Sequence, residues 1–322
     1  MRFLKNSDEN NSTGRRAPLA LIAGPTASGK SDLAVRLALA LHERGRQAVI
    51  INADSAQVYA DLAVLSARPR EDEMQGVPHM LFGEWDGAVA CSAADWAQTA
   101  REVVIEAQAA NAVPILVGGT GLYLRTLLDG IAPVPPIDPE VRAEVRGMHV
   151  SEAHSALARE DPMRAAQLAP NDSTRVARAL EVVRSTGKPM AYWQMHREGG
   201  IASSVALHAS LLLPDRDWLY RRCDARFAAM LVNGALSEVE ALLARQLDPS
   251  LPVMRAIGVP ELSAYLRGQC SLAEAEAAGA QATRNYAKRQ FTWFRHQPPG
   301  DWSRIESHNI DAEVNFASLL HN

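Results

Sequence analysis

The chain has 322 residues and a mass of 34.9 kDa, with 47% hydrophobic and 22% charged residues. This composition excludes a disordered chain and is typical of one large globular domain or two smaller ones. A net charge of −4 at pH 7 gives no overall attraction to nucleic acid, so any RNA-binding surface must be local. No apolar run approaches the roughly 18 residues of a membrane span, and the 3 cysteines form no CxxC pair. We therefore expect a cytoplasmic protein with no membrane contact, zinc knuckle or disulfide framework. A monomer is a separate expectation.

The N-terminal third alternates short apolar runs with amphipathic segments. Residues 1–17 are polar and are expected to be a disordered tail. Leu33, Leu37 and Leu41 recur at helical spacing before Gly45, which is a typical helix stop. Alternation of strands and helices predicts an α/β fold with a parallel sheet covered by helices. The expected strands are 19–23, 49–51 and 114–117, and the expected helices are 30–44 and 93–111.

The clearest break in the chain is the proline-rich run 131–139, which favours an extended connector. Beyond it, residues 140–194 have the pattern of a helical lobe, and 205–213 that of a strand returning to the sheet. Helices are expected at 218–245 and 271–295, the second starting at the capping box of Ser271 and Glu274. The predicted divisions are a core in two parts, 18–137 and 201–300, a helical insertion at 138–200, and a tail at 301–322.

A phosphate-binding motif follows the first expected strand and opens the first helix. Its residues are Gly24, Pro25, Thr26, Ala27, Ser28, Gly29, Lys30 and Ser31, which match GxxxxGK[ST]. In such a P-loop, backbone N–H groups and the helix N-terminus face phosphate oxygens, the lysine bridges phosphates, and the hydroxyl of Ser31 can bind Mg²⁺. The motif predicts a site for a diphosphate or triphosphate. Alone, it favours a nucleotide or small-molecule kinase.

Two further segments end buried strands at the same expected edge of the sheet. Asp54 follows the second strand, where a lone aspartate is equally typical of a helix cap and of a metal ligand. The segment VGGTGLY, from Val117, brings the hydroxyl of Thr120 to this edge, although a tight turn before a helix would have the same pattern. A third segment, TRNYAKRQFTWFRH from Thr283, is basic and aromatic without acidic residues, which is typical of contact with RNA phosphates and unstacked bases. A solvated charged helix face is the alternative interpretation of that segment.

Together these segments resemble the tRNA dimethylallyltransferase (isopentenyl-diphosphate:tRNA transferase) family. The matching motifs stand in family order over nearly the whole chain: GPTASGKS, ADSAQVY, VGGTGLY, RALEV, RFAAM and YAKRQFTWFR. The resemblance implies a P-loop core with a helical insertion that contacts the anticodon stem-loop of tRNA. It also implies transfer of a dimethylallyl group from dimethylallyl diphosphate to N6 of the adenosine 3′ of the anticodon, position 37, with Mg²⁺ as cofactor. A kinase and a P-loop RNA-binding module without catalysis remain the alternatives.

The resemblance assigns roles to residues of this chain. Asp54 would take the proton from N6, while Lys30, Arg226 and Mg²⁺ held through Ser31 would neutralise the departing diphosphate. Thr120 would lie beside the reacting centre, and Gln57 would read an adenine edge. The implied tRNA contacts are Asp54, Ser55, Ala56, Gln57, Thr120, Arg142, Asp172, Arg175, Arg255, Gly258, Lys288, Arg289, Gln290, Trp293 and Arg295.

The chain departs from the family pattern at several places, among them Ser31, which replaces the commoner threonine and keeps the hydroxyl. Met80 replaces the second histidine after His79, so the histidine pair of the family pattern is absent. The family's GTAKP is LSARP here, which keeps a basic residue at Arg68, whereas Pro260 replaces a basic residue of IGYKE. One tRNA contact is therefore expected to be missing. The zinc-finger extension of eukaryotic relatives is absent from the sequence, which favours a bacterial-type enzyme.

Overall fold

The chain divides into two units in the computed structural model, which describes residues 16–321. Unit 2 is Leu127–Ile201, and unit 1 contains the described residues on either side of it. We expected the insertion at 138–200, but the proline-rich connector belongs to it as well. The reason is a pair of reciprocal backbone hydrogen bonds of 3.0 Å between Ile131 and Glu198, which joins the two ends of unit 2. Most of the tail expected at 1–17 lies outside the described residues, although Ala17 already belongs to the first strand.

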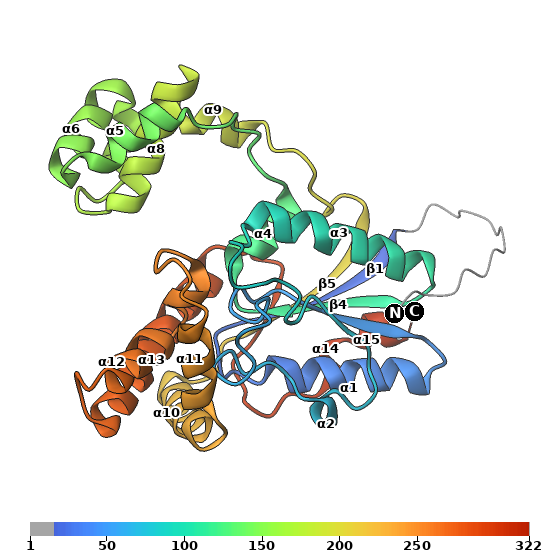
Figure 1. Cartoon of the computed structure of the whole chain (residues 1–322). Helices are drawn as coiled ribbons and strands as arrows, with labels where there is room; N and C mark the ends of the chain where they lie inside the picture. The colour runs from blue at the N-terminus through green and yellow to red at the C-terminus, as the bar shows by residue number, and fades with distance from the viewer. Residues whose placement is uncertain (1–15, 322) are drawn as a thin grey trace. The chain divides into compact units, whose positions relative to one another are not determined.

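Unit 1 is built on a six-stranded parallel sheet in the order β3-β2-β4-β1-β5-β6 (Figure 1). The strands are β1 Ala17–Ala23, β2 Ala48–Asn52, β3 His79–Met80, β4 Val113–Gly118, β5 Val205–Leu212 and β6 Ser303–Ile305. The register aligns Ala23 with Gly118 and Asn52 with Val117, so the loops after β1, β2 and β4 leave the same edge. The predicted α/β class with a parallel sheet is thereby confirmed. This edge carries the P-loop, Asp54 and Thr120.

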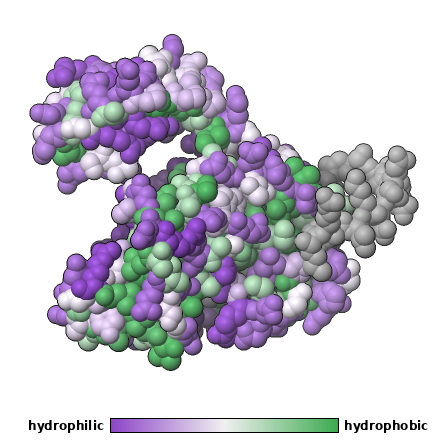
Figure 2. All heavy atoms as spheres, viewed as in Figure 1, coloured by the Kyte–Doolittle hydropathy of each residue, from purple (hydrophilic) through white to green (hydrophobic). Residues whose placement is uncertain are grey.

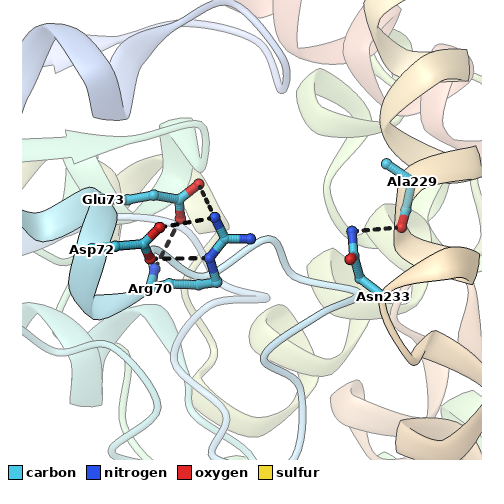
Figure 3. A network of polar contacts seen from close by, with 5 residues as sticks. All are labelled: Arg70, Asp72, Glu73, Ala229 and Asn233. Carbon is cyan, nitrogen blue, oxygen red and sulfur yellow. Dashed lines mark hydrogen bonds and ion pairs between the residues drawn. The ribbon is translucent and has the colours of Figure 1, made fainter.

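Helices cover both faces of the sheet (Figure 1). On one face, α1 (Lys30–Glu43) packs through the predicted stripe of Leu33, Leu37 and Leu41, all fully buried. On the other, α3 (Ala93–Ala109) begins at a capping box and buries Trp96 completely. The helix α4 (Gly121–Asp129) follows β4 directly, as expected of a strand–turn–helix unit. Between β2 and β3, the short α2 (Glu71–Met74) is preceded by Arg70, which pairs with Asp72 and Glu73 (Figure 3).

A bundle of helices stands at the carboxyl edge of the sheet, within unit 1 (Figure 1). Its members are α10 Arg216–Val232, α11 Ala235–Ala244, the 3₁₀ turn η1 Pro252–Arg255, α12 Val259–Leu266 and α13 Leu272–His296. The single helix predicted for 218–245 is wrong, because Asn233 turns its side chain back to the Ala229 carbonyl (Figure 3) and Gly234 has a φ of 99°. Only glycine adopts that conformation without strain. Among the described helices none is by itself long and apolar enough to cross a membrane, and α10 with α11 meets that length and composition only as a bent pair.

The residues expected to form a tail, 301–322, are part of the core as far as the structure describes them. β6 extends the sheet, and α14 (Ala312–Asn315) and α15 (Ala317–Leu320) follow it. Ile305, Phe316 and Leu319 are buried in the same hydrophobic cluster as the apolar stripe of α1. The prediction of a tail was therefore wrong. These short segments are too small to show a period, and their burial depends on partners almost 300 residues away in the chain.

Unit 2 is a small helical unit with a core of its own. It contains α5 Pro139–Gly147, α6 Val150–Glu160, α7 Pro162–Gln167, α8 Ser173–Thr186 and α9 Met190–Met195. Asp138, Asp161 and Asp172 each accept a hydrogen bond from a backbone N–H of the helix that follows them, so three of these helices have an aspartate N-cap. Leu157, Val176 and Leu180 are fully buried in its hydrophobic cluster.

Candidate functional site

The P-loop has the backbone conformation of a phosphate cradle. Gly24 leaves β1 so close to β5 that a Cβ there would lie 2.4 Å from the Leu212 carbonyl oxygen. Ala27 and Gly29 have φ values of 62° and 92°, which turn the loop before α1 begins at Lys30. The Lys30 ammonium donates to the Pro25 carbonyl at 2.6 Å, within the loop itself. The N-terminus of α1 and the Lys30 side chain therefore lie together at one anion-binding corner.

Side chains of two helices of the bundle, α10 and α13, form hydrogen bonds with the backbone of the P-loop. The Thr26 N–H donates to Oε1 of Gln290 on α13 at 2.7 Å, and Nε of Arg222 on α10 donates to the Ala27 carbonyl at 2.9 Å. The guanidinium of Arg222 also stacks over the ring of Trp218 at 4.7 Å. Neither Arg222 nor this use of Gln290 was predicted. Both contacts link residues almost 200 or more positions apart, and no local pattern carries such a signal.

Asp54 is held at the end of β2 by the buried amide of Asn52. The Asp54 N–H donates to Asn52 Oδ1 at 2.8 Å, and Asn52 Nδ2 donates to the carbonyls of Asp54 and Leu81. Nε1 of Trp96 donates to the Asn52 carbonyl at 2.9 Å. One carboxylate oxygen of Asp54 accepts from the Ala56 N–H at 3.0 Å. This hydrogen bond fixes the carboxylate at the sheet edge and leaves its second oxygen without a hydrogen bond among the described residues.

Thr120 joins the Asp54 loop to the loop after β4. The Ser55 N–H donates to its hydroxyl at 2.9 Å, and its own hydroxyl donates to Ser55 Oγ at 3.2 Å. Tyr286 of α13 places its hydroxyl close to both Thr120 and Ser55. Burial and the charge of Asp54 raise the pKa of the Tyr286 hydroxyl, so it is neutral at physiological pH. The structure therefore places Thr120 beside Asp54, as expected, and adds Tyr286.

Two adjoining cavities meet at Asp54. The smaller, about 40 Å³, lies over the P-loop and is lined by Lys30 and Ser31. The larger, about 320 Å³, is lined mainly by apolar and aromatic side chains of the sheet edge, α10 and α13, among them Tyr59, Tyr123 and Phe227. Both are lined by Thr26, Asp54 and Arg226, so one carboxylate and one guanidinium stand at their junction.

Burial shifts the pKa values of the ionisable groups at this junction. Burial lowers the pKa of the Lys30 ammonium to about 8, although the negative charge of Asp54 opposes the shift. Burial likewise lowers the pKa of the Arg226 guanidinium, again opposed by Asp54. Burial raises the pKa of the Cys223 thiol, which lines the larger cavity, to about 11, so this thiol is not a thiolate at neutral pH. Two cations facing one carboxylate leave the smaller cavity with an excess of positive charge, which favours an anion.

The segment 62–68 contributes residues to the walls of both cavities and is fixed at both ends. Nε2 of Gln57 donates to the carbonyls of Ser66 and Ala67, and Arg226 donates to the Ser66 carbonyl at 3.3 Å. The carboxylate of Glu238 on α11 accepts hydrogen bonds from three successive backbone N–H groups, those of residues 63–65. Both amide hydrogens of Gln57 are thus already used. The Gln57 amide nitrogen therefore has no hydrogen left to donate to an adenine edge, which was the role expected of Gln57.

The basic C-terminal helix has two different faces. Lys288, Arg289 and Arg295 are exposed, as predicted for an RNA contact. Arg284, counted in the same basic stripe, instead pairs with Asp224 of α10, because an acidic partner comes from another helix. On the inner face, Trp293 packs against Gly121, where a Cβ would lie 2.5 Å from the indole ring. Gln290 is 6% exposed and hydrogen-bonded at both ends of its amide, so it is not offered to RNA as expected.

The other predicted tRNA contacts are distributed over both units. In unit 2, Arg142 is exposed on α5, while Asp172 caps α8 and pairs with Arg175 at 3.4 Å. In unit 1, Arg255 lines the larger cavity from η1, and Gly258 precedes α12 with a φ of 97°. Two departures from the family pattern have structural places. Pro260 lies in the first turn of α12, where it suits a helix start, and Met80 lies in the edge strand β3.

Comparison with known proteins decides the family. A family model described as IPP transferase matches residues 57–297, which is most of the chain. The chain belongs to the IPP transferase family. A tRNA dimethylallyltransferase of Erythrobacter litoralis is 66% identical over 95% of this chain and 97% of its own length. One from Zymomonas mobilis is 50% identical over 95% of each chain.

Solved structures of IPP transferases have the same fold. The full-length tRNA isopentenylpyrophosphate transferase of Bacillus halodurans matches with a TM-score of 0.67 at 31% identity, covering 95% of each chain. A eukaryotic dimethylallyltransferase acting on tRNA matches with a TM-score of 0.74 at 26% identity, over 86% of this chain and 69% of that one. The resemblance stated from six short motifs is confirmed.

Proposed function

We propose that this IPP transferase moves a dimethylallyl group from dimethylallyl diphosphate to N6 of the adenosine at position 37 of tRNA. The observation that carries the proposal is the junction of two cavities at Asp54. A cationic cavity over a P-loop suits the diphosphate, and a larger apolar and aromatic cavity suits the prenyl group and a base taken out of its stack. The names of the relatives, tRNA dimethylallyltransferase, describe the same reaction.

In the proposed reaction, the diphosphate binds at the N-terminus of α1 with Lys30 and Arg226 on its oxygens. The C–O bond between the allylic carbon and the diphosphate breaks, and negative charge builds up on the leaving group. These two cations neutralise that charge as it forms, which lowers the barrier more than it stabilises the bound substrate. The released product is diphosphate, and no phosphoryl group is transferred.

The nucleophile is the exocyclic N6 of adenine, a weak one because its lone pair is delocalised into the ring. As the N6–C bond forms, N6 loses a proton, which Asp54 accepts. One oxygen of Asp54 is held by Ala56, so the other is oriented for this transfer. Thr120 keeps the Asp54 loop in place through Ser55. The product is N6-dimethylallyladenosine.

The chain's residues fit a Mg²⁺ that is held largely by the diphosphate. Ser31 contributes a hydroxyl to the smaller cavity beside Lys30, and among the described residues there is no group of three or more His, Cys, Asp or Glu side chains that could enclose an ion. Mg²⁺ at phosphates keeps several waters and few protein ligands, so one hydroxyl suffices. When bound, the ion would add positive charge at the leaving diphosphate.

The proposal is tested by one assay run in two ways. Protein, Mg²⁺ and unmodified tRNA receive radiolabelled dimethylallyl diphosphate in one reaction and γ-labelled ATP in the other. We expect label on the tRNA in the first and intact ATP in the second. ATP consumption with unlabelled tRNA would overturn the proposal and favour a kinase that uses the same P-loop. The tRNA recovered from the first reaction is digested to locate the label at adenosine 37.

A further inference from the structure

The side chain of Gln290 links the P-loop to the loop after β4. Its Oε1 accepts from the Thr26 N–H at 2.7 Å, and its Nε2 donates to the Gly119 carbonyl at 2.8 Å. The two partners fix the orientation of the amide, because an N–H needs the oxygen and a carbonyl needs the nitrogen. Gln290 comes from a third element, α13, and is buried. One side chain therefore sets the spacing of two substrate-facing loops.

The side-chain amide of Gln290 is closely packed against the loop after β4. A Cβ at Gly119 would lie 2.2 Å from Gln290 Nε2 and 3.1 Å from the Gly24 carbonyl oxygen, so glycine is needed for the approach. Tyr286 and Trp293, one turn before and one after Gln290 on the same face of α13, contact Thr120 and Gly121. Residues at i, i+4 and i+7 share a helix face. This inner face of α13 is thus fitted to three consecutive residues, from the end of β4 to the first residue of α4.

We propose that Gln290 is a positioning residue that holds the P-loop in its diphosphate-binding conformation by joining Thr26 to Gly119. The proposal rests on the proposed function for the identity of the ligand. Gln290 touches no reacting atom, and it acts through the backbone of the P-loop. Because the exposed Lys288 and Arg289 belong to the same turns of α13, this amide also connects the basic face of the helix to the diphosphate site.

The first test measures binding of inorganic diphosphate, with Mg²⁺, by calorimetry in the absence of tRNA. Q290L keeps the volume of the side chain and removes both hydrogen bonds, which leaves the Thr26 N–H and the Gly119 carbonyl unpaired. We expect diphosphate affinity to fall by about tenfold, because the P-loop itself loses one buried hydrogen bond, the one from the Thr26 N–H. The matched control is Q281L, at an exposed glutamine of the same helix. Its affinity should equal that of the wild type.

The second test distinguishes positioning from a general structural role. Q290E keeps an acceptor for Thr26, but an ionised carboxylate cannot donate to the Gly119 carbonyl. A protonated carboxyl has both a donor and an acceptor, and burial beside a carbonyl raises its pKa. We therefore compare the diphosphate affinity of Q290E with that of the wild type at each pH. The ratio of the two affinities should rise towards 1 as the pH falls from 8 to 5.5. Loss of packing alone would give a ratio that does not change with pH.

Three outcomes overturn the proposal: Q290L binding diphosphate within about twofold of the wild type, a pH-independent ratio for Q290E, or an equal loss of affinity in Q281L. Thermal unfolding of each variant identifies any that has failed to fold, and Q290E then provides the test in place of Q290L. A wild-type protein that binds diphosphate but does not transfer the prenyl group refutes the proposed function and leaves the role of Gln290 standing. A wild-type protein that binds no diphosphate refutes both.

Discussion

Lys30 makes diphosphate binding sensitive to pH. Burial lowers the pKa of its ammonium to about 8, so in the free protein the charge is present below that pH and is lost as the pH rises through it. The deprotonated amine cannot attract the anion. We expect kcat/KM for dimethylallyl diphosphate to fall by about tenfold per unit above pH 8, because a bound proton is then required. A pH profile of K30M, which has no ionisable group there, should lack this decline, and a decline in K30M of the same size would contradict the assignment.

A substitution at Asp54 distinguishes tRNA binding from the transfer reaction. Asp54→Asn keeps an oxygen that accepts from Ala56 and removes the base. Prenyl transfer should fall by about 10²- to 10⁴-fold, the usual contribution of a positioned general base. Binding of tRNA, measured by filter retention, should change little. Unchanged turnover would remove Asp54 as the base, and lost tRNA binding would mean that the substitution disturbs the loop instead.

At the scale of single residues, the sequence predicts what is local and misses what is long-range. The P-loop, Asp54 and Thr120 follow strands at fixed short spacing, so their places at the sheet edge were predicted. Arg222 and Gln290 reach the P-loop from helices far along the chain, and no pattern within either helix indicates the contact. Only the resemblance singled out Gln290, and it implied a contact with tRNA. The amide is buried and both its oxygen and its nitrogen are hydrogen-bonded within the protein, so it does not make that contact.

Among the elements, α11 fixes the segment 62–68 through one carboxylate. Glu238 accepts hydrogen bonds of 2.5, 2.8 and 2.8 Å from the backbone N–H groups of residues 63, 64 and 65. E238A leaves these groups without their acceptor. We expect a loss of about 2 kcal/mol in the free energy of unfolding, the scale of hydrogen bonds to a charged group, measured by urea denaturation. E240A, at an exposed position on the same helix, is the control and should unfold like the wild type.

The exposed face of α13 should carry part of the affinity for tRNA. Replacing Lys288 and Arg295 together by glutamine removes two exposed cations while the residues that line the two cavities are unchanged. Binding of tRNA should weaken, and the slope of log affinity against log salt concentration should become shallower by about 1 to 2. R36Q, on α1, is the control. An unchanged slope in the double variant would show that this face does not contact phosphates.

The boundary of α13 could be predicted because capping residues mark it. Ser271 and Glu274 form the predicted capping box, and α13 begins at the next residue, Leu272. The break between α10 and α11 depends on an Asn–Gly pair that also occurs inside longer helices at modest cost, so it was missed. The 3-residue strand β6 is too short to show alternation. Its place in the sheet is decided by β5, whose backbone groups on that side pair with β6.

At the scale of the whole molecule, the two cavities belong to one unit and the other unit folds around a separate core. Every residue that lines the two cavities belongs to unit 1, whereas unit 2 has its own hydrophobic cluster. The two ends of unit 2 meet at Ile131 and Glu198, which exchange hydrogen bonds as a pair of antiparallel residues does. A two-residue turn can close such a pair. Unit 2 is therefore built as an insertion whose removal leaves a gap that a hairpin turn spans.

Replacing residues 132–197 by Asn-Gly tests this division. The shortened protein should keep the core of unit 1 and bind diphosphate as the full chain does, because the P-loop, Arg222, Arg226 and Gln290 are all retained. Its affinity for tRNA should fall, since the exposed Arg142 and the cap of α8 are removed with unit 2. Calorimetry with diphosphate and filter retention with tRNA measure the two effects separately. If the folded, shortened protein lost diphosphate binding but kept tRNA binding, unit 2 would be supporting the P-loop, and the assignment of each substrate to its own set of residues would be wrong.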